Sequence, residues 1–240
     1  MVDRVTVHLT ALACSARAPE VLARFWGAML GREVMAEPVG LLLPGSETQV
    51  GLRFVADPAP RAAVDRAHLH LTSTTPDDQQ QIVARARDLG ATPLDVGQRA
   101  EEGHIVLADP EGNAFCVIEA GNAFLAGTGL LGELACDGTR DVGRFWAAAL
   151  SWPLVWDQDE ETAIQAPAGG TKIAWGGPPV APLAASPRER FELAVGADEA
   201  DGEITRLLAL GATRHTDPAD GTALMTDPDG NEFLVARSVA

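Results

Sequence analysis

The chain has 240 residues, of which 46% are hydrophobic and 22% charged, the balance of a globular protein with room for two domains. Its formal net charge of −16 is spread along the sequence, so nucleic acid and anionic membrane surfaces are excluded as favourable partners. No apolar run approaches the roughly 20 residues that span a bilayer, and the first residues lack a signal-peptide pattern, so we expect a cytoplasmic protein.

In chain order, the first half alternates apolar strands with two helices. The first helix begins at Pro19, which suits a first turn, and ends at Gly31. The second begins after Thr75, a residue that caps helices, and ends at Gly90. β-Branched and apolar residues predict strands near 4–14, 41–43, 50–55, 67–72 and 93–96.

The second half predicts the same order of elements. We expect helices over 140–150 and 201–210. Strands are expected near 130–136, 163–165, 172–175 and 190–195, followed by a final hairpin.

Asp109–Phe115 recurs as Asp227–Phe233, and each copy lies between two apolar runs. Pro fixes φ at the second position of a turn, and Gly and Asn tolerate the left-handed conformation, so each copy predicts a hairpin. Three other segments recur in the same order: Leu12–Cys14 as Leu134–Cys136, Arg24–Trp26 as Arg144–Trp146, and Leu89–Thr92 as Leu210–Thr213. This is an internal duplication, and we expect two domains, residues 1–122 and 123–240.

Each copy contains the pattern strand–helix–strands twice. Short strands between widely spaced helices indicate an α+β fold with curved, antiparallel-rich sheets. The sheet face turned away from the helices must also be covered, so two modules would set their sheets around a shared cleft. Such a concave, partly apolar space is where a small molecule binds.

These motifs together resemble the vicinal oxygen chelate superfamily, which contains glyoxalase I, extradiol dioxygenases, and bleomycin- and fosfomycin-resistance proteins. The similar features are the helix with Phe-Trp, the His-Leu-His-Leu strand, the Leu-Gly-Ala helix end and the Asp-Pro-Glu/Asp-Gly-Asn-x-Phe turn. The match is strongest to the glyoxalase-like domain subgroup and covers nearly the whole chain twice. It implies four βαβββ modules in two glyoxalase-like domains, but it does not name the reaction.

The resemblance also implies where a metal would be held, because metal-dependent relatives place His or Glu ligands on the first strand of each module and on a late strand. Counting from the repeated motifs gives Ala11, a position near Leu52, His68 and Cys116 in the first copy. It gives Glu133, a position near Ile173, Arg190 and Leu234 in the second copy. Neither copy assembles three good ligands on this count, and Arg190 would put a fixed positive charge where a cation should lie.

We therefore expect no metal cofactor. His68 and Cys116 could hold zinc only with one more donor such as His70. Three cysteines without CxxC spacing also argue against a disulfide framework or a structural zinc site.

His68 and His70 are two apart on a strand, so their side chains share one face. If this face is the cleft, they bind a ligand or His68 acts as an acid or base; if it is covered, they are core residues. Arg190 and Glu192 occupy the corresponding positions in the second copy, either as a ligand-fixing pair or as a surface salt bridge. The predicted ligand-binding set is Arg53, His68, His70, Cys116, Glu133, Trp175, Arg190 and Glu192.

Three hypotheses follow. In the first, the protein binds a hydrophobic or aromatic metabolite, or an antibiotic, without a metal. In the second, it is a lyase or isomerase that recruits a metal such as zinc or uses His68 as a general base. In the third, one copy binds ligand and the other is a structural partner. The sequence leaves open whether the chain forms a homodimer.

Overall fold

The computed structural model describes residues 6–57, 66–99, 101–183, 188–215 and 221–238. Within these ranges the chain forms four helices and 16 strands, arranged as two eight-stranded sheets. The strand pairs are mainly antiparallel, and four of them are parallel. The predicted α+β class and the tandem modules are confirmed.

The first repeat contributes two modules, each with one helix. The first module consists of β1 (His8–Ala16), α1 (Pro19–Leu30), β2 (Met35–Glu37), β3 (Gly40–Leu43) and β4 (Gly51–Ala56). The second consists of β5 (Ala67–Leu71), α2 (Pro76–Asp88), β6 (Thr92–Pro93), β7 (Ile105–Ala108) and β8 (Ala114–Val117). Both helices begin at the predicted proline, and the Thr75 side chain caps α2 by accepting the Asp78 N–H at 3.0 Å.

The second repeat follows the same plan. Its first module consists of β9 (Leu131–Cys136), α3 (Arg140–Leu150), β10 (Leu154–Gln158), β11 (Glu161–Gln165) and β12 (Lys172–Trp175). Its second consists of β13 (Glu189–Gly196), α4 (Ala200–Ala209), β14 (Thr213–Arg214), β15 (Ala223–Thr226) and β16 (Glu232–Ser238).

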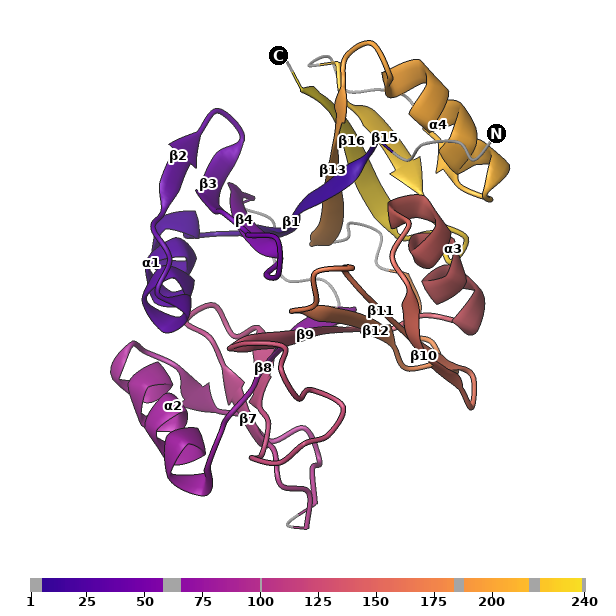
Figure 1. The fold of residues 1–240 in the computed structure, drawn as a ribbon. Coiled ribbons are helices and arrows are strands. Elements are labelled where there is room, and N and C mark those ends of the chain that lie inside the picture. Colours follow the sequence, from indigo (N-terminus) through magenta and orange to yellow (C-terminus); the bar gives the residue numbers. More distant parts are fainter. Residues whose placement is uncertain (1–5, 58–65, 100, 184–187, 216–220, 239–240) are drawn as a thin grey trace.

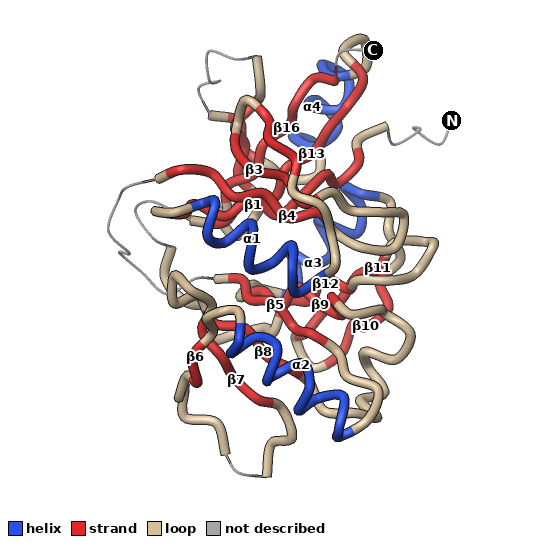
Figure 2. Tube along the Cα trace, turned by 90° about the vertical axis from the view of Figure 1, so that its left-hand side faces the viewer, coloured by secondary structure: helices blue, strands red, loops and turns tan. Residues whose placement is uncertain are grey.

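Each sheet combines one module from each repeat (Figure 1). Sheet A joins the first and last modules in the order β14-β15-β16-β13-β1-β4-β3-β2, and sheet B joins the middle two in the order β10-β11-β12-β9-β5-β8-β7-β6. The joins are the antiparallel pairs β1·β13 and β5·β9. Figure 2 shows the strands of sheet A above those of sheet B, with α1 and α2 on the side that faces the viewer. The two repeats are therefore interleaved.

Aromatic residues of the repeated motifs pack the core. Trp26 lies edge-on to Phe115 with ring centroids 5.1 Å apart, and Trp146 lies in the same way against Phe233, also at 5.1 Å. Both tryptophans are almost fully buried. Edge-to-face pairs of this kind are favourable beyond the area that they bury, so both tryptophans stabilise the core.

The repeated Asp-Pro turn has a second task besides reversing the chain. In the first copy, Asp109 accepts hydrogen bonds from the backbone of Glu111 and Asn113 and from the indole of Trp26. Gly112 adopts the positive φ of 83° that the turn requires. The Glu111 carboxylate then accepts the backbone N–H groups of Arg17 and Ala18 ahead of α1. A carboxylate here satisfies free N–H groups and complements the helix dipole.

The second copy repeats this arrangement. Asp227 accepts the indole N–H of Trp146 at 3.1 Å, and Asp229 accepts the backbone N–H and the hydroxyl of Thr139, the N-cap of α3. The turns lie in one sheet and the helices pack on the other. The repeated motif thus ties sheets A and B together at two equivalent places. No helix in the described part of the chain is long and apolar enough to cross a membrane.

Candidate functional site

One face of sheet B gathers polar side chains from both repeats. On β5, Leu69 and Leu71 point into the core, so His68 and His70 face the other way. The pairing of strands sets His70 opposite Glu133 on β9 and opposite Cys116 on β8. Lys172 on β12 lies on the far side of Glu133. The two histidines therefore share the face that points away from the core.

Hydrogen bonds link three of these residues. His70 Nδ1 lies 2.6 Å from Glu133 Oε2, and His70 also hydrogen-bonds Cys116. Burial alone would lower the pKa of His70, but its hydrogen bonds to Cys116 and Glu133 outweigh burial and raise the pKa to about 9. Burial and the adjacent His70 lower the pKa of His68 to about 4. At neutral pH the site thus holds a charged His70 next to a neutral His68.

A cavity of about 430 Å³ opens beside these histidines. Its polar end carries His68, His70 and Glu133, and its floor includes the small side chains of Ala135 and Ala174. This volume lies in the range of small-molecule sites.

Two aromatic side chains form the wall of this cavity. The rings of Phe124 and Trp156 meet edge to face at 6.1 Å. Lys172 donates a hydrogen bond to the Phe124 carbonyl, and its ammonium lies 4.1 Å from the centre of the Phe124 ring. Phe124 belongs to the connection between the repeats, so this connection contributes to the wall.

The equivalent face of sheet A is occupied by an ion-pair cluster. Arg53 on β4 is 5% exposed and contacts Glu37 at 2.7 Å and Glu192 at 2.6 Å. Arg190 lies 3.8 Å from Glu232 in a more exposed pair. The two predicted residues Arg53 and Glu192 are thus joined to each other, but they lie on the sheet opposite to the one that carries His68 and His70.

The register corrects the metal positions inferred from sequence. Ala11 pairs with Glu192 and Gly51, and Glu192 in turn pairs with Leu234. Glu192 therefore occupies the place that the sequence count gave to Arg190, and Gly51 replaces Leu52. The count was wrong by two residues on β13 because both positions share one face.

The same correction applies to sheet B, where the four equivalent residues are Glu133, Lys172, His70 and Cys116. His70 takes the place assigned to His68, and Lys172 takes that of Ile173. The positions were counted copy by copy, but each sheet takes two of them from each repeat, because β5 and β8 come from the first repeat and β9 and β12 from the second.

Trp175 lines the same cavity as His68, His70 and Glu133, but it is almost fully buried. Its side chain is 2% exposed and belongs to the core, and a Cβ on Gly143 of α3 would lie 3.0 Å from its ring. The ring thus packs beneath α3, and Trp175 also contributes to the lining of the cavity, where its low exposure leaves little ring area for stacking on a ligand.

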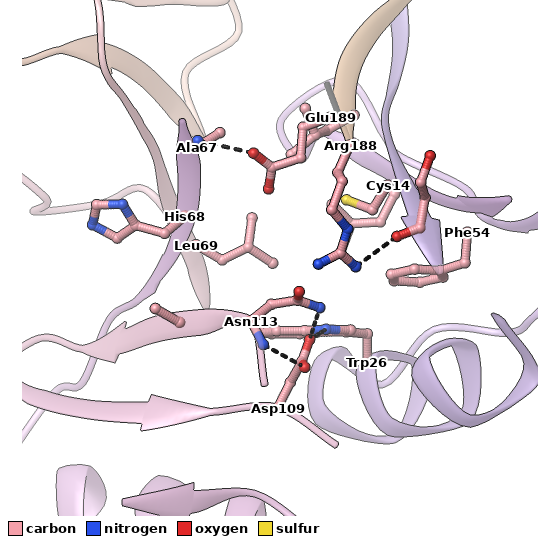
Figure 3. Close-up of a pocket in the computed structure, with 14 residues that line it drawn as sticks. Cys14, Trp26, Phe54, Ala67, His68, Leu69, Asp109, Asn113, Arg188 and Glu189 are labelled. Atoms are coloured by element: carbon pink, nitrogen blue, oxygen red, sulfur yellow. Dashed lines mark hydrogen bonds between the residues drawn. The ribbon is translucent and has the colours of Figure 1, made fainter. Parts of the chain in front are cut away.

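A second, much smaller cavity of about 30 Å³ lies where the two sheets meet (Figure 3). It is bounded by Trp26 and Asp109 and by Arg188, which donates to the Ser15 carbonyl at 2.8 Å. Glu189 accepts the Ala67 N–H at 2.9 Å across the same boundary. A space of this size holds about one water molecule, so it belongs to the packing between the sheets.

Three residues on sheet B could hold a metal ion. The ligand atoms of His68, His70 and Cys116 all lie within 4.8 Å of one another. Two imidazoles and a thiolate suit zinc, and the Glu133 carboxylate on His70 Nδ1 is the kind of contact that orients a metal-binding histidine. The donor set therefore fits zinc better than magnesium or calcium, which prefer oxygen ligands.

A model of the glyoxalase-like domain matches residues 11–118 and again residues 133–236. The chain belongs to the glyoxalase-like domain family. Glyoxalase I from Zea mays is similar over 97% of this chain and 92% of that one, with a TM-score of 0.61 and 11% identity. A candidate dioxygenase from Bacillus subtilis is similar over 99% and 87%, with a TM-score of 0.64 and 13% identity. No curated protein matches the sequence.

The family model establishes the glyoxalase-like family, the two solved structures show only that the fold is shared, and the chemistry is left to the site. Sequence analysis did not assign Phe124, Lys172 or the alanine floor to this site. Phe124 lies in the connection between β8 and β9, outside the repeated motifs. The only signal for Lys172 was that it is the sole lysine of the chain.

Proposed function

We propose that this glyoxalase-like protein binds a small hydrophobic or aromatic organic molecule, a metabolite or an antibiotic, in the cavity on sheet B and without a metal ion. The observation that carries this proposal is the cavity of about 430 Å³, which combines aromatic walls with polar groups at one end. Phe124 and Trp156 offer apolar area, and His68, His70 and Glu133 offer donors and acceptors that fix orientation.

Lys172 supports binding without a metal. It occupies the place beside Glu133 where a metal-dependent relative would carry a ligand. Burial lowers the pKa of Lys172, while the Glu133 charge opposes this. An ammonium group at this place repels a divalent cation and competes for Glu133. His70 already engages the same carboxylate at 2.6 Å.

The proposal is tested with protein purified without chelator. Native mass spectrometry should detect a co-purifying organic molecule, and elemental analysis should find substoichiometric zinc, nickel, manganese and iron. His68→Ala should weaken binding of that molecule, whereas His8→Ala, at an exposed strand end, should not. Unchanged affinity in His68→Ala would show that the cavity is not the binding site.

The geometry also favours a second candidate, a metal-dependent lyase or isomerase, because His68, His70 and Cys116 converge. A bound zinc ion would act there as a Lewis acid that polarises a substrate carbonyl or activates water. His68, neutral at pH 7, is then also available to move a proton. Stoichiometric metal that is lost in Cys116→Ser, together with lyase or isomerase activity, would favour this candidate over the first.

The sheet A cluster supports the proposal that one face binds ligand while the other is structural. Arg53 and its two carboxylates fill the face that corresponds to the cavity. A binding stoichiometry of one molecule per chain is the expected result, and calorimetry measures it.

A further inference from the structure

The internal duplication allows the two sheets to be compared position by position. Ala13 and Ala135 are equivalent through the repeated Leu-Ala-Cys segment. Ala13 pairs with Arg53, and Ala135 pairs with Ala174. Ala174 in sheet B is therefore the counterpart of Arg53 in sheet A. The long side chain is present in one sheet, and the cavity lies over the alanine in the other.

In sheet A this space holds a guanidinium group. The Arg53 side chain reaches Glu192 and Glu37 and is almost fully buried. A buried guanidinium is stable only where carboxylates or other acceptors surround it. Sheet A thus shows which chemistry this part of the fold accommodates when the space is filled.

The corresponding space in sheet B is also bordered by carboxylates. Glu133, Asp137 and Glu161 are among the described residues that line the cavity, and none of those residues is a lysine or an arginine. Glu133 is already paired with His70. No lysine or arginine within the described ranges forms an ion pair with Asp137 or Glu161, so two negative charges remain to be matched.

The aromatic wall points to the same kind of ligand. Trp156 and Phe124 lie beside these carboxylates, and Lys172 already places its ammonium 4.1 Å from the Phe124 ring centre. Aromatic faces attract cations as well as apolar groups. A ligand that joins a flat ring to a positive charge would satisfy both the wall and the carboxylates.

We propose that the cavity on sheet B selects a flat aromatic ligand that carries an amidinium, guanidinium or ammonium group. This cationic group lies over Ala174, in the space that corresponds to the one filled by the Arg53 guanidinium in sheet A. This inference rests on the proposed binding function and adds the charge of the ligand.

Three probes of nearly identical shape test the inference: benzamidine is cationic, benzamide neutral and benzoate anionic. Dissociation constants come from saturation-transfer NMR titrations of the full-length protein. Benzamidine should bind roughly tenfold more tightly than benzamide, since two partly exposed ion pairs and a cation–π contact together supply about this factor. Benzoate should bind most weakly of the three. Added salt should reduce the difference in affinity between the cationic and the anionic probe.

Variants locate the effect. Glu161→Gln and Asp137→Asn should each weaken benzamidine several-fold and leave benzamide unchanged. Glu160→Gln, at the adjacent position of the same hairpin, alters the net charge equally outside the cavity and should change neither constant. Trp156→Ala should weaken both probes.

The outcomes separate the two proposals. If benzamidine and benzamide bind equally and Trp156→Ala weakens both, the cavity binds ligands but the inferred charge is wrong. The same conclusion follows if Glu160→Gln weakens benzamidine as much as Glu161→Gln does. If none of the three probes binds, the proposed binding function fails as well.

Discussion

Trp26 on α1 donates its indole N–H to Asp109 at 3.2 Å, and this bond crosses from the helix layer of sheet A to a turn of sheet B. In the second repeat the equivalent bond runs from Trp146 on α3, which packs on sheet B, to Asp227 in a turn of sheet A. The two bonds explain why the Phe-Trp and Asp-Pro motifs recur together although they lie far apart in the sequence. Each motif supplies one partner of a contact between sheets.

Removing the indole N–H of Trp26 should destabilise the fold. Trp26→Phe keeps an aromatic ring but leaves the buried Asp109 carboxylate with one donor fewer. We expect a loss of about 1 to 3 kcal/mol of unfolding free energy from the hydrogen bond, with a further contribution from the smaller ring. Urea denaturation measures it. Trp152→Phe is the control, because the Trp152 indole makes no hydrogen bond within the described residues; equal losses in the two variants would contradict the prediction.

Arg53 should be one of the positions in sheet A at which a substitution destabilises the fold most. Arg53→Ala leaves Glu37 and Glu192 without their common partner, and breaking a buried ion pair costs about 3 to 5 kcal/mol. The Arg190–Glu232 pair is longer and more exposed. Arg190→Ala should therefore cost less than about 1 kcal/mol. Chemical denaturation of both variants checks this order, and a reversed order would show that Arg53 is not a structural centre of sheet A.

Ala174→Arg should close the cavity. It introduces into sheet B the residue that sheet A carries at the equivalent place, next to carboxylates that can accept it. Benzamidine binding should be lost while the unfolding free energy changes little. Ala209→Arg, on the exposed end of α4, is the matched control. Retained binding in Ala174→Arg would show that ligand lies elsewhere.

The two neighbouring histidines should titrate far apart. In metal-free protein, NMR should show His70 losing its proton near pH 9 and His68 near pH 4. A pKa raised above the unfolded value of about 6.5 means that the His70 contribution to stability is complete below that pH and is lost as the pH rises through about 9. Stability should therefore fall between pH 7 and 10.

Glu133→Gln removes the carboxylate partner of His70 and should reduce the fall in stability between pH 7 and 10. Coincident titration of His68 and His70 would show that the Glu133 contact does not form in solution.

The fold was largely predictable because its signals are local. Pro19 and Gly31 mark the ends of α1, and the Asp-Pro turns dictate their hairpins whatever surrounds them. The edge strands β2 and β10 were missed, since Met35–Glu37 and Leu154–Gln158 are short and mostly exposed and show little alternation.

The site was less predictable because it depends on pairing between distant strands. Alternation correctly set His68 and His70 on one face, but a period of two cannot say which of them lies opposite Glu133. Nor does a duplicated sequence show which modules share a sheet. Glu133 and His70 belong to different repeats, and only the β5·β9 pairing brings them together.

The interleaving of modules has a consequence for the chain as a whole. Residues 1–122 alone would leave β1 and β5 without their β13 and β9 neighbours, and residues 123–240 would leave the complementary edges bare. The two halves, produced as separate chains, should therefore associate with each other or with a second copy of themselves, because this restores both strand pairings. Within the single polypeptide the two repeats therefore pair as two subunits of a twofold assembly would, with the Arg53 ion pairs on the face of one sheet and the cavity on the equivalent face of the other.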